Sequence, residues 1–246
     1  NEMGEVPSLS RISGHRGAPS LAPENTLTSF EAAWQAGAGW TETDVCLLGD
    51  GTAVMFHDDS LDRCTDRSGS IEQLTREDLA QVNANRQFPD SPFTPIPTLA
   101  EALIHAEATG MGLNIELKRH DHVTAAALVE AAVPVLRQHP LKPGQLMLSS
   151  FDFDALRLAK AAMDGVPMAV IAEALSDEMI TVAHEIGAHS LNLWWETLRQ
   201  DLVAQALDEG FQVNVWTVND PALAPALFGW GVSCIITDRP QDFDGL

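Results

Sequence analysis

Short apolar runs alternate with helix-like segments throughout the second half of the chain. The apolar runs start about 22 residues apart, at Gln145, Pro167, Ser190, Gln212 and Cys234. Amphipathic segments with helical spacing separate most of them, over Phe153–Met163, Ser176–Ile186, Leu198–Glu209 and Pro221–Phe228. Buried parallel strands are almost continuously apolar, and strands that alternate with helices at this pitch form βα units. This half therefore predicts five parallel strands with helices between them.

The first half follows the same pattern at less regular intervals. Apolar runs predict three strands, over Ser10–His15, Trp40–Leu48 and Gly112–Lys118. Helical spacing predicts helices over Pro23–Ala36, Thr98–Thr109 and His122–Gln138. Eight βα units in roughly 250 residues are typical of a (β/α)₈ TIM barrel of the α/β class, here with the last helix nearly absent. An open dinucleotide-binding sheet is less favoured, because the turn at Gly14–Gly17 lacks the G-x-G-x-x-G spacing.

One segment interrupts the regular alternation. A Gly-Asp-Gly turn at Gly49–Gly51 joins the second predicted strand to another apolar run, Thr52–His57, and turns of this kind favour a hairpin. A proline-rich stretch then leads to the helix that starts at Thr98. We expect a single domain over residues 1–246, with an insertion at about 58–97 that covers the mouth of the barrel.

Composition limits the classes of function. Hydrophobic residues make up 45% of the chain, which excludes a disordered protein, and no stretch approaches the run of about 20 apolar residues that spans a membrane. The 14 Lys and Arg residues against 35 Asp and Glu residues produce a formal net charge of −21 at pH 7. That charge argues against nucleic acid as a partner, because phosphate backbones need clustered Lys and Arg. Taken alone, it also argues against an anionic substrate.

Cysteine usage fits a reducing compartment. Cys46, Cys64 and Cys234 cannot all pair, and each lies beside apolar residues, so we expect small buried thiols and no disulfide framework. This pattern predicts a cytoplasmic location. The visible N-terminus, which begins at Asn1, contains no signal peptide, and a leader cleaved during maturation stays open as an alternative.

Acidic side chains gather at the ends of the predicted strands, where barrel enzymes place their functional residues. Glu42 and Asp44 alternate on the second strand and therefore share one face, and Glu116 lies on the third strand. Three converging carboxylates would repel one another, and a hard divalent cation such as Mg²⁺ or Ca²⁺ removes that repulsion. Solvated strand ends or ion pairs with arginines are the alternative. Zinc is disfavoured, since this ligand set is all oxygen.

Basic and imidazole groups lie at the same strand ends. Lys118 follows the third strand and Arg16 the first, and both suit a phosphate group, although Lys118 could instead reach solvent or pair with Glu116. His15 and His57 both end apolar runs, and two imidazoles that titrate near neutrality can act as acid and base. The remaining histidines are expected at the surface: His105, His120, His122, His139, His184 and His189. No G-x-S-x-G motif supports a serine hydrolase.

These residues occur in an order that resembles the glycerophosphodiester phosphodiesterase family. The most specific block is GHRGAPSLAPENTLTSFEAAWQAGAGWTETDVCLLGDGTAVMFHDDSLDRCT, from Gly14 to Thr65. The resemblance continues in LNIELK at Leu113–Lys118, SSF at Ser149–Phe151, VWTVN at Val215–Asn219 and ITDRP at Ile236–Pro240. It therefore covers nearly the whole chain.

The resemblance implies a TIM barrel with Glu42, Asp44 and Glu116 as ligands of Mg²⁺ or Ca²⁺. The segment that follows His57 matches a small insertion of the family. The implied reaction is the hydrolysis of a glycerophosphodiester, such as glycerophosphocholine or glycerophosphoethanolamine, to glycerol 3-phosphate and an alcohol.

Roles for the other site residues follow from the same resemblance. His15 and His57 correspond to the general acid/base pair, and we assign His15 as the base and His57 as the acid. Arg16 and Lys118 correspond to phosphate contacts, and Trp216 to a residue that lines the substrate site. Either water or the neighbouring glycerol hydroxyl could be the nucleophile.

Two other functions compete with this one. A barrel phosphodiesterase that acts on lysophospholipids, similar to the lysophospholipase D and spider-venom phospholipase families, would have an apolar rim. The insertion is instead mixed, with Phe88 and Phe93 among prolines, which favours soluble headgroups. A non-catalytic barrel that binds phosphodiesters would have lost a histidine or a metal ligand, yet all are present. The oligomeric state stays open.

Overall fold

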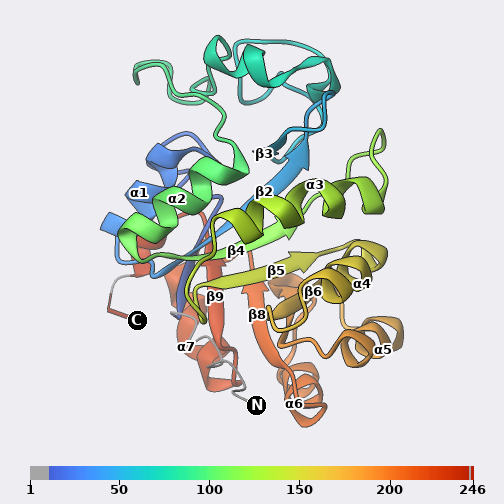
Figure 1. The fold of residues 1–246 in the computed structure, drawn as a ribbon. Helices are drawn as coiled ribbons and strands as arrows, with labels where there is room; N and C mark the ends of the chain where they lie inside the picture. The colour runs from blue at the N-terminus through green and yellow to red at the C-terminus, as the bar shows by residue number, and fades with distance from the viewer. Residues whose placement is uncertain (1–10, 244) are drawn as a thin grey trace.

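Eight parallel strands form a closed barrel in the computed structural model, which describes residues 11–243 and 245–246 (Figure 1). The barrel strands are β1 (Ile12–His15), β2 (Trp40–Leu47), β4 (Gly112–Leu117), β5 (Leu146–Ser150), β6 (Met168–Ala172), β7 (Ser190–Trp194), β8 (Gln212–Trp216) and β9 (Cys234–Thr237). Each pairs with the next barrel strand, and β1 pairs in parallel with both β9 and β2, which closes the ring. The prediction of a TIM barrel is confirmed.

The additional strand belongs to the predicted hairpin. β3 (Ala53–Met55) runs antiparallel to the end of β2, with Val45 opposite Met55 and Leu47 opposite Ala53. Gly51 in the connecting turn has a φ of +85°, a conformation that glycine adopts without steric cost. The hairpin extends β2 beyond the barrel and leads into the insertion.

Helices surround the barrel and cover its outer face. They are α1 (Leu27–Gln35), α2 (Leu99–Thr109), α3 (Ala125–Gln138), α4 (Phe153–Ala162), α5 (Asp177–Ile186), α6 (Gln200–Asp208) and α7 (Ala224–Gly229). The first helix begins later than its predicted start at Pro23, because Asn25 has a φ of +56° and Thr26 is the extended N-cap. After β9 the described chain forms a 3₁₀ helix at Pro240–Phe243 in place of an eighth α-helix.

The inner face of β2 has a distinct order of side chains. Trp40, Glu42 and Asp44 alternate along the strand and therefore point to the same side. Trp40 packs against Met147 and Ala169 in a small buried cluster, and its ring occupies the space that a Cβ at Gly112 would need. An apolar floor thus lies at one end of the strand, and the two carboxylates lie nearer its carboxyl end.

The insertion has a small hydrophobic cluster of its own. It contains two 3₁₀ helices, Ile71–Gln73 and Arg76–Ala80, and Figure 1 shows it above the end of β2. Its buried side chains include Leu61 and Val82, which cluster with residues of the hairpin such as Phe56. The insertion is therefore fixed to the strand that carries two of the site's carboxylates.

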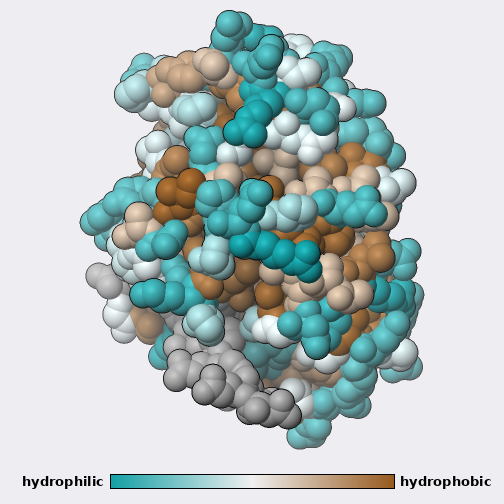
Figure 2. All heavy atoms as spheres, in the orientation of Figure 1, coloured by the Kyte–Doolittle hydropathy of each residue, from teal (hydrophilic) through white to brown (hydrophobic). Residues whose placement is uncertain are grey.

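The described helices have at most 14 residues, and the three cysteines are free thiols. No helix in the described part of the chain is long and apolar enough to cross a membrane. Cys46, Cys64 and Cys234 are all buried free thiols, as predicted, and burial raises the pKa of Cys64 and of Cys234 to about 12. Hydrophilic residues spread over the face shown in Figure 2, with smaller hydrophobic areas between them.

Candidate active site

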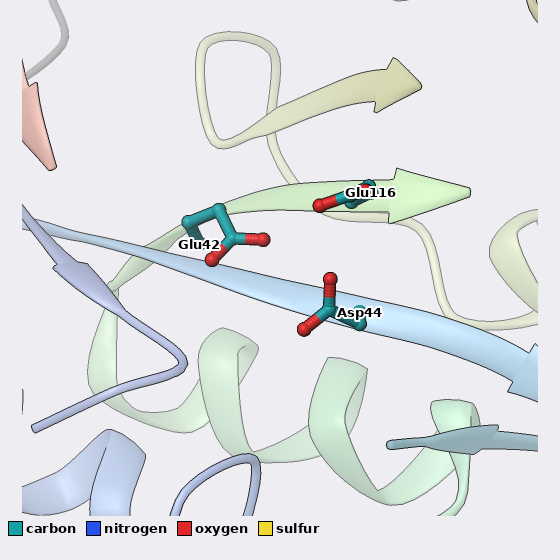
Figure 3. A group of neighbouring side chains, drawn as sticks. All are labelled: Glu42, Asp44 and Glu116. Carbon is teal, nitrogen blue, oxygen red and sulfur yellow. The ribbon is translucent and has the colours of Figure 1, made fainter. Parts of the chain in front are cut away.

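Three carboxylates from two neighbouring strands converge inside the carboxyl end of the barrel. Glu42 and Asp44 come from β2 and Glu116 from β4, and the parallel register places Asp44 beside Glu116. One carboxylate oxygen from each residue lies within 4.8 Å of the others. Figure 3 shows the three side chains directed toward a common point between the strands. The convergence predicted from the strand ends is confirmed.

Burial makes this carboxylate cluster electrostatically unfavourable. The three residues are only 5%, 1% and 8% exposed, in the order Glu42, Asp44 and Glu116. Burial, followed by the neighbouring carboxylates, raises the pKa of Glu42 and of Glu116 well above the ordinary range. Burial acts on Asp44 in the same direction, but nearby Arg16 and His57 lower its pKa overall. Without a further cation, the cluster therefore favours protonated glutamates beside an ionised aspartate.

The donor set fits a hard divalent cation. Both carboxylate oxygens of Glu42 and the Oδ1 atom of Asp44 have no hydrogen-bond partner among the described residues. Buried polar atoms are normally satisfied, so unsatisfied oxygens that face one another indicate a place for a cation that prefers oxygen ligands. Asn25 donates from Nδ2 to Asp44 Oδ2 at 3.0 Å and fixes the orientation of that carboxylate.

His15, at the end of β1, is oriented by a carboxylate from the other end of the chain. Its Nδ1 atom lies 2.6 Å from Asp238 Oδ1, and Asn219 donates to the other oxygen of Asp238 at 2.9 Å. An ionised carboxylate can only accept, so Nδ1 donates to it, and in the neutral form of the imidazole Nε2 then has the free electron pair. That Nε2 atom lies 3.8 Å from Glu42 Oε2, beside the carboxylate cluster.

His57 is likewise paired with a carboxylate, that of its neighbour Asp58. Its Nδ1 atom lies 2.7 Å from Asp58 Oδ1, and burial lowers the pKa of the imidazole below its ordinary value. His120 donates from Nε2 to the backbone carbonyl of His57 at 2.9 Å and is only 8% exposed. The surface prediction for His120 is therefore wrong, because the loop after β4 folds this side chain against His57.

A single cavity of about 210 Å³ brings the predicted site residues together. Its lining comprises His15, Arg16, Glu42, His57, Glu116, Lys118, Phe151, Ile171, Asn192, Trp216 and Ile236. Every predicted site residue except the deeper Asp44 is in this set. Lys118 Nζ lies 4.0 Å from Glu116 Oε1, so its pairing with Glu116, which the sequence left open, is present.

An aromatic wall forms one side of this cavity. Trp216 donates from Nε1 to the backbone carbonyl of Asn192 at 3.1 Å, which fixes the indole. Phe151 meets it edge to face at 5.9 Å, and Trp194 stacks on it at 6.5 Å. A neighbouring cleft of about 550 Å³ shares His15 and Arg16 with the cavity and is otherwise mainly polar.

Sequence reasoning missed several residues that orient the site. Asp58 and Asp238 hold the two histidines, and Asn25 holds a carboxylate of the cluster. Each lies within a motif that carried the family resemblance, and Asp58 follows His57 directly. The signal was therefore available, but only the folded chain shows which side chain each of them contacts.

The site combines three buried carboxylates with two imidazoles that carboxylates orient and with the positive side chains of Arg16 and Lys118. This combination at one end of a barrel is suited to the hydrolysis of phosphate esters. The family model for the glycerophosphoryl diester phosphodiesterase family matches residues 15–242. The chain belongs to this family and is a phosphoric diester hydrolase.

Individual relatives align with this chain over most of their length. A glycerophosphodiester phosphodiesterase of Bacillus subtilis is 28% identical over 93% of this chain and 83% of its own. One from Caldanaerobacter subterraneus subsp. tengcongensis is 27% identical, over 94% of each chain. Among solved structures, an Oleispira antarctica phosphodiesterase in complex with the product sn-glycerol-3-phosphate has a TM-score of 0.91 and 34% identity, and covers 96% of this chain and 95% of that chain.

Proposed function

We propose that the chain hydrolyses glycerophosphodiesters to glycerol 3-phosphate and an alcohol by two-histidine acid/base catalysis that depends on a divalent metal. The observation that carries this proposal is the single cavity in which His15, His57, Arg16 and Lys118 surround the carboxylate cluster. The product named for the Oleispira antarctica structure supports glycerol 3-phosphate as the product here.

Glu42, Asp44 and Glu116 would hold Mg²⁺ or Ca²⁺. Both ions prefer carboxylate oxygens, and the unsatisfied oxygens of Glu42 and Asp44 are of this type. When bound, such an ion stabilises negative charge on phosphoryl oxygens and lowers the pKa of a bound hydroxyl group.

Arg16 and Lys118 bind the phosphate from the rim of the same cavity. The guanidinium of Arg16 lies 3.7 Å from Asp44 and hydrogen-bonds Glu24 at 3.0 Å, so it is held in place by two carboxylates. Its planar set of donors can grip two phosphate oxygens, while the ammonium of Lys118 acts as a point charge. Both interactions strengthen as negative charge builds on the phosphoryl group.

The partners of the two histidines favour His15 as the base and His57 as the acid. The carboxylate of Asp238 holds His15, and among the described residues its only other hydrogen-bond donor is the neutral side chain of Asn219, so this carboxylate stabilises the imidazolium that forms when His15 accepts a proton. Asp58 instead shares its charge with two hydrogen bonds from Arg63. It therefore stabilises protonated His57 less, which makes His57 the readier proton donor.

Protons and bonds balance for either nucleophile. In direct hydrolysis, His15 takes a proton from water while the water oxygen bonds to phosphorus. The bond between phosphorus and the alcohol oxygen breaks, and His57 protonates the alcohol oxygen. If the neighbouring glycerol hydroxyl attacks first, it loses its proton to His15, its oxygen bonds to phosphorus, the bond to the alcohol oxygen breaks, and His57 protonates the departing alcohol. Water then bonds to phosphorus and loses a proton to His57, and the ring bond to the former hydroxyl oxygen breaks as His15 returns a proton to that oxygen. Both routes add one water across the same phosphorus–oxygen bond.

The shape of the cavity favours a small glycerol group. Trp216, Phe151 and Ile171 form its apolar side, and a volume of about 210 Å³ suits glycerol phosphate better than a group with an acyl chain. The alcohol then leaves toward the polar cleft that His15 and Arg16 share. This arrangement supports soluble headgroups over lysophospholipids.

A substrate panel tests the proposal. Purified enzyme would be incubated with glycerophosphocholine, glycerophosphoethanolamine and lysophosphatidylcholine, with and without a chelator, and glycerol 3-phosphate and free alcohol would be measured. We expect turnover of the first two, loss of activity with the chelator and recovery with Mg²⁺ or Ca²⁺. Release of choline from lysophosphatidylcholine alone would support the lysophospholipid alternative, and full activity under chelation would refute the role of the metal.

A further inference from the structure

Arg63, on the insertion, joins two carboxylates that hold different parts of the site. Its Nη1 and Nη2 atoms bind the two oxygens of Glu24 at 2.6 and 3.0 Å. Its Nε and Nη2 atoms bind the two oxygens of Asp58 at 2.8 and 3.0 Å. Both interactions are bidentate, the geometry for which a guanidinium is suited. One side chain thus accounts for four charge-assisted hydrogen bonds.

Each of these carboxylates also contacts a residue that lines the reaction cavity. Glu24 accepts from Arg16 Nη1 at 3.0 Å, and Asp58 lies 2.7 Å from His57 Nδ1. The result is a continuous chain of charged contacts from Arg16 through Arg63 to His57. Arg63 itself lines the neighbouring cleft and not the 210 Å³ cavity, and it is linked to Arg16 and His57 through Glu24 and Asp58.

Charge balance makes this link specific for an anionic substrate. Glu24 is a buried carboxylate whose side chain is 7% exposed, and burial alone would raise its pKa, but Arg63 and Arg16 lower it. Without Arg63, Arg16 would be the only cation in contact with Glu24 among the described residues, and Asp44 lies on its other side. Arg16 would then be held by carboxylates more strongly and would attract a phosphate less.

We propose that Arg63 is a positioning residue. Through Glu24 and Asp58 it fixes the positions of Arg16 and His57 relative to each other, and it keeps the positive charge of Arg16 available to the phosphate. This inference rests on the proposed function. An ordinary surface ion pair would contribute little, because exposed pairs are screened by solvent. Here one partner is buried, both interactions are bidentate and each partner contacts a side chain of the cavity.

The first test compares Arg63→Gln with Arg67→Gln, a change of the same kind at an exposed arginine of the same insertion. Steady-state kinetics with glycerophosphocholine should show a loss in kcat/KM on the order of 10- to 100-fold for Arg63→Gln, as for other residues that orient a site from outside it. Calorimetry should show several-fold weaker binding of sn-glycerol 3-phosphate. The Arg67→Gln variant should match the wild type in both, and the thermal midpoints should be similar.

A double-mutant cycle with Glu24→Gln separates positioning from a general loss of structure. The neutral amide that Glu24→Gln introduces no longer needs a guanidinium, so the Glu24→Gln/Arg63→Gln double variant should lose less activity than the product of the two single losses. A ligand-free readout completes the test. The ¹⁵N spectrum of labelled histidines should change at His57 Nδ1 in Arg63→Gln and stay unchanged in Arg67→Gln.

Some outcomes overturn the inference without touching the proposed function. The role would be excluded if the wild type is active and Arg63→Gln keeps kcat, KM and product affinity within about twofold of it. It would also be excluded if the loss of activity in the double variant equals the product of the losses in the two single variants. Conversely, a wild type that hydrolyses no glycerophosphodiester would refute the proposed function. The His57 spectra would then still decide whether Arg63 positions that side chain.

Discussion

Metal binding at Glu42, Asp44 and Glu116 should be measurable as a large increase in thermal stability. Binding to the folded state alone stabilises a protein by RT ln(1 + [L]/Kd), which is about 2.7 kcal/mol at a hundredfold excess over Kd. For a chain of this size each kcal/mol raises Tm by about 2–4 °C, so the expected increase is about 5–10 °C.

The pKa values of Glu42 and Glu116 set the pH dependence of this increase. Because both are raised in the metal-free fold, the folded chain binds more protons than the unfolded chain between the ordinary carboxyl range and the raised values. Their contribution to the stability of the metal-free protein therefore falls as pH rises through that window. A cation displaces these protons, so its affinity and the Tm increase should both grow as pH rises through the same window.

Differential scanning calorimetry, with chelator and with saturating Mg²⁺ or Ca²⁺, checks the prediction. The Glu42→Gln/Glu116→Gln variant loses two ligands and should show no response to metal. Its metal-free Tm at pH 7 should equal or exceed that of the wild type, because two carboxyl groups with unfavourable ionisation are gone. The control Glu107→Gln/Glu130→Gln makes the same two substitutions at exposed helical positions and should keep the full increase. An equal increase in the ligand-deficient variant, or none in the wild type, would refute the reasoning.

Three further predictions concern the histidines and their carboxylates. Replacing His15 or His57 by Ala should each lower kcat on the order of 10²- to 10⁴-fold with little change in far-UV circular dichroism, and near-normal turnover would remove that histidine from the mechanism. Asp238→Asn should lower kcat far more than it raises KM, because the amide no longer stabilises the His15 imidazolium; a change in KM alone would contradict this role. Finally, the lowered pKa values of Glu24 and Asp58 mean that these groups stabilise the fold fully above the ordinary carboxyl range. That contribution should be lost progressively once pH falls below the ordinary carboxyl range, so Tm should decrease from about pH 5 to about pH 3, and a Tm that stays constant over that range would argue against it.

The barrel was predictable because its strands are buried on both faces. Such strands are continuous apolar runs, as at Met168–Ala172, and the regular spacing between them leaves room for one helix each. The site was predictable for a related reason, since parallel strands bring their carboxyl ends to one rim. Glu42, Asp44 and Glu116 therefore had to lie near one another once the strands were placed.

Contacts made by loops could not be predicted in this way. Asp238 reaches His15 only because β9 pairs with β1 and closes the ring, which joins positions 223 residues apart. Sequence spacing contains no information about the loop after β4, so it predicts a surface position for His120, which in fact supports the backbone of His57. The alternation of side chains along the strands determines which residues lie at the rim of the barrel. The path of each loop determines which other side chains contact these residues and orient them.

The net charge of −21 illustrates the difference between a sum over the chain and the field at a site. As a sum, it argues against an anionic substrate. In the structure, Glu42, Asp44 and Glu116 form a donor set for a cation, and Arg16 and Lys118 lie at the cavity that Glu42 and Glu116 line. Arg63 binds Glu24, which contacts Arg16, and Asp58, which contacts His57. It therefore offsets the negative charge that each carboxylate places beside these two side chains. Affinity for a phosphodiester therefore depends on how these few charges are paired, because exposed charges farther away are screened by solvent and salt.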